Sequence, residues 1–238
     1  FNTSGATSCP GTPITFTITI NPRGQVNTIP GQVVCNGDSV TIANFSTTNT
    51  GGTTTYSWTS SNPSVGLTTP GNGDIPGFTA NNTTTAPIST VITVTPTFEN
   101  GGVSCVGTPN TITITVNPTG QVNQPNNFVF CAGTPSTAIS FTSVNINGNT
   151  TYSWTNNTLG IGLGASGTGT IPVFTPVNNT TSPILVTITV IPTFTNEFKS
   201  CTGPSKTFTI TINPRGQVNT ASDLSLIHIS EPTRQAEI

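Results

Sequence analysis

The sequence repeats itself with a period of 96 residues. A seven-residue segment, Asn-Pro-Arg-Gly-Gln-Val-Asn at Asn21–Asn27, returns with one change at residue 117 and unchanged at residue 213, so both steps are 96 residues. Other landmarks keep the same step: Tyr56-Ser57-Trp58 with Tyr152-Ser153-Trp154, and Cys9 with Cys105 and Cys201. This period is too long for a solenoid unit and fits a small domain, so the chain is predicted to be a tandem array of domains.

The period divides the chain into five parts. We expect residues 1–22 to end with the last strand of a truncated preceding repeat, and residues 23–118 and 119–214 to be two complete repeats. Residues 215–223 would begin a further, truncated repeat. The chain starts in mid-repeat and contains no Met, so we expect that its native N-terminus is missing.

The last part, residues 224–238, has no counterpart in the repeats. Its text, from Leu224 to Ile238, resembles the conceptual translation of a sequencing adapter, and we exclude it from the biological interpretation. The alternative is a genuine short tail. The exclusion also removes His228, the only histidine in the chain.

Charged residues are scarce, which narrows the choice of partners. The chain has only 5 Lys and Arg and 7 Asp and Glu in 238 residues, so it lacks the basic surface that phosphate neutralisation requires. Nucleic acid is therefore not expected as a partner. The apolar residues are mostly β-branched and alternate with Thr, which favours folded β-structure over disorder.

Each repeat reads as a series of short strands. In the first repeat, Val40–Phe45, Pro87–Phe98 and Thr111–Val116 alternate apolar and polar residues, as half-buried strands do. Tyr56 and Trp58 lie two positions apart on another strand and share one face, as do their equivalents in the second repeat. The expected core aromatics are Tyr56, Trp58, Tyr152 and Trp154. About seven strands per repeat around a single Trp predict an all-β fold of tandem immunoglobulin-like antiparallel sandwiches.

The ordered motifs resemble a known family. They are Cys-x-Gly before one strand, Tyr-Ser-Trp on the next, a Val-x-Val-Thr-Pro strand, a second Cys-x-Gly, and Thr-Ile-Thr-Val-x-Pro. This set is similar to the PKD-like repeats of very large surface and gliding-associated proteins of Gram-negative bacteria. The Phe-Gly-Asp-Gly type turn usual after Trp is replaced by Thr59–Pro63. The resemblance implies a bacterial cell-surface location and a role in adhesion or gliding motility.

The cysteines also follow the period. Each complete repeat has two, 70 residues apart: Cys35 with Cys105, and Cys131 with Cys201. Even pairing indicates an oxidising compartment. Pairing within each repeat is the simplest scheme, but the two cysteines of one repeat fall at opposite ends of an immunoglobulin-like sandwich. A bond between Cys35 and Cys201 across the repeat junction, or free thiols, are the alternatives, and the sequence leaves all three open.

No constellation of reactive side chains is visible. The complete repeats hold only four carboxylates, and Asp38, Asp74 and Glu99 are each replaced by Thr in the second repeat. We therefore predict no enzyme activity, no catalytic residue, no cofactor and no repeat-encoded metal site.

The sequence therefore favours a non-catalytic extracellular stalk whose partners are neighbouring repeats of the same chain, without membrane insertion in this part. The alternative is a module that binds carbohydrate or another surface through the loops Asn49–Thr55 and Asn145–Thr151, either by itself or as an accessory to an enzyme domain elsewhere. We also expect residues 13–20, the last strand of the truncated repeat, to lack a native partner and to be poorly ordered or to add to a sheet edge.

Overall fold

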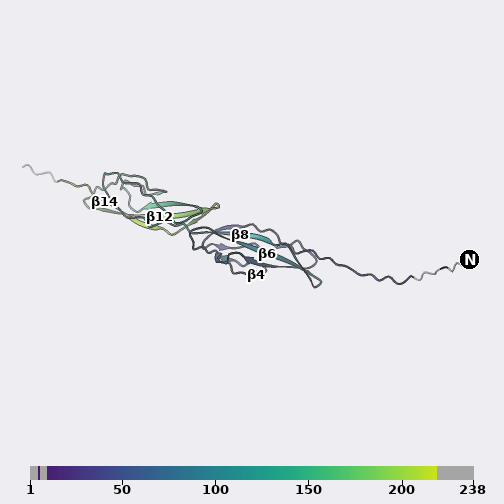
Figure 1. Ribbon diagram of the computed structural model, residues 1–238. Coiled ribbons are helices and arrows are strands. Elements are labelled where there is room, and N and C mark those ends of the chain that lie inside the picture. The colour runs from purple at the N-terminus through teal and green to yellow at the C-terminus, as the bar shows by residue number, and fades with distance from the viewer. Residues whose placement is uncertain (1–4, 6–9, 219–238) are drawn as a thin grey trace, which may run out of the picture. The chain divides into compact units, whose positions relative to one another are not determined.

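The computed structural model describes residue 5 and residues 10–218 (Figure 1). The tail expected at 224–238, Cys9 and most of the expected truncated repeat at 215–223 lie outside the described residues. The described chain forms two compact units. One contains the chain up to Asn123, Thr142–Tyr152 and Ile191–Ser205, and the other contains Gln124–Phe141, Ser153–Val190 and the chain from Lys206.

The first repeat forms a large sheet and a small one. In the large sheet the strand order is β1-β8-β6-β3-β4, and β7 pairs with β6. The small sheet pairs β2 with β5. The bounds are β1 Gln32–Cys35, β2 Ser39–Val40, β3 Thr53–Ser60, β4 Gly71–Asn72, β5 Phe78–Thr79, β6 Ile88–Asn100, β7 Val103–Val106 and β8 Asn110–Asn117, with one short 3-10 helix, η1, at Pro63–Val65.

The second repeat forms a sheet of the same order. It runs β11-β10-β12-β14-β9, and β13 pairs with β12. The bounds are β9 Phe128–Cys131, β10 Asn149–Asn156, β11 Ser166–Thr168, β12 Ile184–Asn196, β13 Lys199–Thr202 and β14 Lys206–Asn213. An antiparallel bridge also joins Ile139 and Ile171 in this repeat.

The strand order confirms the all-β, immunoglobulin-like prediction. β1 runs parallel to β8 and β9 runs parallel to β14, so the first strand of each repeat is parallel to its last strand, whereas β6 with β8 and β12 with β14 are antiparallel. In the first repeat one core contains Val40 of the small sheet together with Trp58, Ile92 and Ile114 of the large sheet. Since both sheets contribute to the same core, the first repeat is a sandwich.

The two tryptophans occupy equivalent core positions. Trp58 is 3% exposed and Trp154 is 4% exposed, whereas Tyr56 and Tyr152 are half-buried. Trp58 pairs across the sheet with Gly71, and Trp154 pairs with Gly167. The indole rings lie over these glycines because neither glycine has a Cβ in the way.

Residues 13–20 join no strand among the described residues. Their apolar side chains at Ile14, Phe16, Ile18 and Ile20 are between 74% and 93% exposed. The same alternation is buried in β8 at Ile112, Ile114 and Val116. The strand expected here is therefore absent from the structure, since it lacks a sheet to complete.

We predict that Gly71→Ala destabilises the first repeat, because a Cβ at this position would lie 2.1 Å from Cζ2 of Trp58. The expected loss is about 1–3 kcal/mol, the usual cost of overpacking a core. Urea unfolding followed by tryptophan fluorescence measures it. Gly77→Ala is the matched control, since its Cβ would approach nothing closer than the Val40 carbonyl oxygen at 3.5 Å. Equal unfolding midpoints for the two variants would contradict the packing described.

Candidate functional site

A disulfide joins Cys35 of the first repeat to Cys201 of the second. Its Cα atoms are 5.5 Å apart, within the usual range, and both residues belong to the same compact unit. Cys35 ends β1, where it is paired with Asn117 of β8. Cys201 lies in β13, paired with Phe194, and is 2% exposed. Of the three schemes that the sequence left open, the structure contains the bond across the repeat junction.

Pairing within each repeat does not occur, and Cys105 and Cys131 are free thiols. The reason is the length of the strands. Cys35 lies at the Asn117 end of β8, whereas Cys105 pairs with Phe98 of β6, beyond the Asn110 end of β8. A strand of eight residues separates these ends by roughly 20–25 Å, while a disulfide needs Cα atoms within about 7 Å.

Beside the disulfide, two asparagines bind each other. The Asn117 side chain donates to the Asn196 carbonyl oxygen at 3.1 Å, and the Asn196 side chain donates to Oδ1 of Asn117 at 3.1 Å. Asn117 is fully buried. The same two bonds, at 2.9 and 3.0 Å, join Asn21 to Asn100, one period earlier. This paired contact is therefore encoded in the repeat.

An ion pair lies next to the disulfide. Nζ of Lys199 is 3.1 Å from Oδ2 of Asp38, and the backbone N–H of Cys35 donates to the same carboxylate at 3.0 Å. The Cys35 hydrogen bond, with help from Lys199 and against the effect of partial burial, lowers the pKa of Asp38 below its ordinary value. Thr134 and Val103 stand at the equivalent positions, so the ion pair is not encoded in the repeat.

A loop of the second repeat completes the junction. The Ile146 N–H donates to the Thr85 carbonyl oxygen at 3.0 Å. The Asn145 side chain accepts from the Gln121 N–H at 2.7 Å and donates to the Thr119 carbonyl oxygen at 3.2 Å. In the second repeat, the loop suggested for glycan binding therefore uses Asn145 to hold the linker. In the first repeat, Asn49 makes the equivalent bonds to Gln25 and Arg23.

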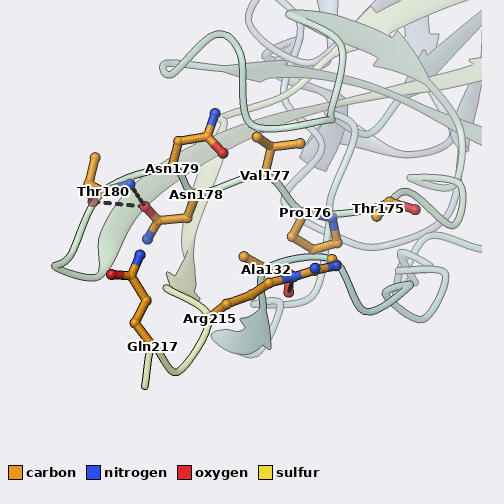
Figure 2. A pocket seen from close by; sticks show the side chains of 10 residues that line it. Ala132, Thr175, Pro176, Val177, Asn178, Asn179, Thr180, Arg215 and Gln217 are labelled. Atoms are coloured by element: carbon orange, nitrogen blue, oxygen red, sulfur yellow. Dashed lines mark hydrogen bonds between the residues drawn. The ribbon is translucent and has the colours of Figure 1, made fainter. Parts of the chain in front are cut away.

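A polar hollow lies in the other compact unit, at the end of the sheet that carries Cys131 (Figure 2). Its volume is about 380 Å³. Arg215 extends across it and donates from Nε to the Ala132 carbonyl oxygen at 3.2 Å. Asn178 accepts from the N–H and the hydroxyl of Thr180 and donates to the Ile212 carbonyl oxygen at 2.8 Å. These groups are engaged in holding the backbone.

Among residues 10–218, no three His, Cys, Asp or Glu side chains gather in a way that could hold a metal ion. The described residues include no helix with the length and apolar character needed to cross a membrane.

No family model matches the chain, and no curated protein matches it in sequence. Several solved structures are similar. A mouse cadherin-23 fragment, EC22-24, is 13% identical over 82% of this chain and 65% of the fragment, with a TM-score of 0.41. A human protocadherin-24 fragment, EC1-2, is 11% identical over 83% of this chain and 100% of the fragment, with a TM-score of 0.43. Three N-terminal domains of the outer capsid protein Hoc of bacteriophage RB49 are 13% identical over 82% of this chain and 71% of theirs, with a TM-score of 0.46. This chain thus spans less than two thirds of the cadherin-23 fragment.

The disulfide leads to a direct prediction. Protease digestion of the monomeric chain, without reductant and without added oxidant, should yield one peptide pair linked through Cys35 and Cys201 on mass spectrometry, while Cys105 and Cys131 of the monomer remain open to alkylation. Recovery of Cys35 linked to Cys105, or of Cys131 linked to Cys201, would contradict the junction described.

The ion pair leads to a pH-dependent prediction. Because the folded-state pKa of Asp38 lies below its unfolded value, its carboxylate stabilises the fold above about pH 4 and loses this effect as the pH falls through the folded pKa. Asp38→Asn should therefore unfold more easily than the parent at pH 7, by less than about 1 kcal/mol because both side chains are 40% exposed. The gap should close as the pH falls below the ordinary aspartate range and through the lowered folded-state pKa of Asp38. Urea unfolding across this pH range measures it, and a gap that widens on acidification would contradict the assignment.

Proposed function

We propose that this chain is part of the non-catalytic stalk of a large bacterial cell-surface protein, an adhesin or a gliding-motility protein built from PKD-like repeats. In this proposal residues 23–118 and 119–214 are the stalk modules, and the adapter-like tail has no role. The observation that carries it is the Cys35–Cys201 disulfide, which fastens consecutive repeats to each other.

The disulfide acts as a second connection between repeats. The linker alone, beginning at Pro118, would leave the two modules free to bend about one point. The disulfide adds an attachment on β13, and the asparagine pair and the Thr85 contact add further ones. Several attachments at different points resist bending and twisting more than a single linker does, and resistance of this kind is what a spacer needs.

The surface of the repeats suits a spacer as well. The solvent-facing positions of β8 and β14 are largely Thr, which has a high strand propensity and carries no charge. With few ionisable groups in the whole chain, the stability of the repeats should change little with salt.

The disulfide also supports the extracellular location. Disulfides form and persist mainly outside the reducing cytosol, and Cys201 is buried at a junction that the bond completes.

The proposal predicts a redox-dependent shape in solution. Small-angle X-ray scattering of the oxidised chain should show an elongated particle about two modules long, with a narrow distribution of interatomic distances. Cys35→Ser with Cys201→Ser should broaden that distribution, because only the linker and weak polar contacts would remain. Cys105→Ser with Cys131→Ser is the matched control and should scatter like the parent. A compact globule, or identical curves for all three chains, would refute the stalk.

A further inference from the structure

The two free thiols stand at the two positions that form the disulfide. Adding one period to Cys35 gives Cys131, and adding one period to Cys105 gives Cys201. We propose that Cys131 and Cys105 are the two halves of a second junction, so that Cys131 of one molecule forms a disulfide with Cys105 of a second copy. This inference deepens the proposed stalk function and rests on it.

The Cys131 surface repeats the Cys35 surface in its backbone. Cys131 pairs with Asn213 of β14 as Cys35 pairs with Asn117 of β8. The Gly133 N–H donates to the Pro176 carbonyl oxygen at 2.8 Å, and one period earlier the Gly37 N–H donates to the Ala80 carbonyl oxygen at 2.8 Å. The surface that receives a neighbour in the first repeat is therefore already built in the second.

The buried asparagine behind each surface is also the same. Asn178 donates to the Ile212 carbonyl oxygen at 2.8 Å, and Asn82 donates to the Val116 carbonyl oxygen at 2.7 Å. The hollow in Figure 2 lies at this end, beside the loop of Thr180. The equivalent loop of the first repeat supplies Thr85, whose carbonyl oxygen accepts from Ile146. The hollow thus marks where the loop of a second copy would bind.

The Cys105 surface repeats the Cys201 surface. Cys105 pairs with Phe98 as Cys201 pairs with Phe194. The Gly24 N–H donates to the Cys105 carbonyl oxygen at 3.1 Å, and the Gly120 N–H donates to that of Cys201 at 3.1 Å. Each unpaired thiol is more exposed than its bonded equivalent. Cys105 is half-buried, whereas Cys201 is buried. Cys131 is exposed, whereas Cys35 is half-buried.

One contact must be exchanged for the second copy to bind. Asn21 occupies the Asn100 side of this surface, through the two hydrogen bonds described above. Asn213 of the molecule that carries Cys131 offers the same side chain to Asn100 of the second copy, so one pair of bonds replaces an identical pair. The preceding segment, residues 13–20, is exposed and joins no strand among the described residues, so little opposes its displacement.

The second junction lacks the ion pair. Thr134 and Val103 replace Asp38 and Lys199, so the covalent bond and the asparagine pair must hold it. Its formation should therefore depend little on salt.

The bond forms by thiol–disulfide exchange. The Cys131 thiolate attacks oxidised glutathione, giving a mixed disulfide and releasing one glutathione thiolate. The Cys105 thiolate of the second copy then attacks the Cys131 sulfur and releases the second glutathione. Two protein thiols are oxidised, two electrons reduce one glutathione disulfide to two thiols, and the two thiol protons leave with the products.

The test mixes isotope-labelled and unlabelled chains, both carrying Cys9→Ser, with oxidised glutathione. We expect covalent oligomers that reductant dissolves, and a peptide pair linked through Cys105 and Cys131 that contains both isotopes. Cys105→Ser or Cys131→Ser should abolish the covalent oligomers. A chain that begins at Arg23 should link faster than the full chain, because Asn21 and the segment before it no longer compete for Asn100.

The control moves the thiol three residues along the chain, from position 131 to position 134. Cys131→Ala with Thr134→Cys keeps an exposed thiol at the same end and should link at least about tenfold more slowly, since docking no longer raises its effective concentration. Equal rates, a link found only within one molecule, or no such link in either chain length would overturn the inference. If Cys35–Cys201 is still present and scattering is elongated, only this inference fails; if Cys35–Cys201 is absent, the stalk proposal fails as well.

Discussion

A disulfide requires two Cα atoms within about 7 Å, and the strands of this fold hold the two cysteines of each repeat much farther apart than that. Cys35 ends the first strand of its sandwich, and Cys105 lies in the hairpin at the opposite end. The two cysteines of one repeat therefore cannot form a disulfide with each other. The bond therefore forms with the next repeat, at Cys201, and the other features of the junction gather around it.

The junction combines contacts of two kinds. The asparagine pair recurs at Asn21 with Asn100 and at Asn117 with Asn196, so it belongs to the repeat. The ion pair between Asp38 and Lys199 occurs once and depends on residues that the other repeat lacks. A repeated polar contact fixes how one repeat is aligned on the next, because a buried amide such as that of Asn117 needs a hydrogen-bond partner. A single exposed ion pair adds little stability.

Much of the fold could be predicted from the sequence. The alternation in Thr111–Val116 and the Tyr-Ser-Trp motif define strands whose pattern depends on local residues alone, and they appear as β8 and β3. The strand expected at Val40–Phe45 is reduced to β2, Ser39–Val40, although Ile42 is buried, because burial does not require a regular ladder. The strand at residues 13–20 fails for a different reason: alternation favours a strand, but a strand needs a sheet to join.

The site was less accessible to sequence reasoning. The positions of the four cysteines in the two complete repeats are visible in the sequence, but choosing the partner of each requires knowing which ends of the repeats meet. The asparagine pair was missed, although one signal existed: Asn recurs at 21, 117 and 213, and at 100 and 196. Lys199 had no such signal, because its ion pair depends on a tertiary contact between two unrepeated residues.

We propose that the disulfide makes consecutive repeats move as one body. Nitrogen-15 relaxation of backbone amides tests it most directly, because it reports the tumbling of each repeat separately. In the oxidised chain, amides of β6 and of β12 should fit one common rotational diffusion tensor, and Cys35→Ser with Cys201→Ser should split it into two faster, independent motions. Independent tumbling of the two repeats while Cys35–Cys201 is intact would contradict the account.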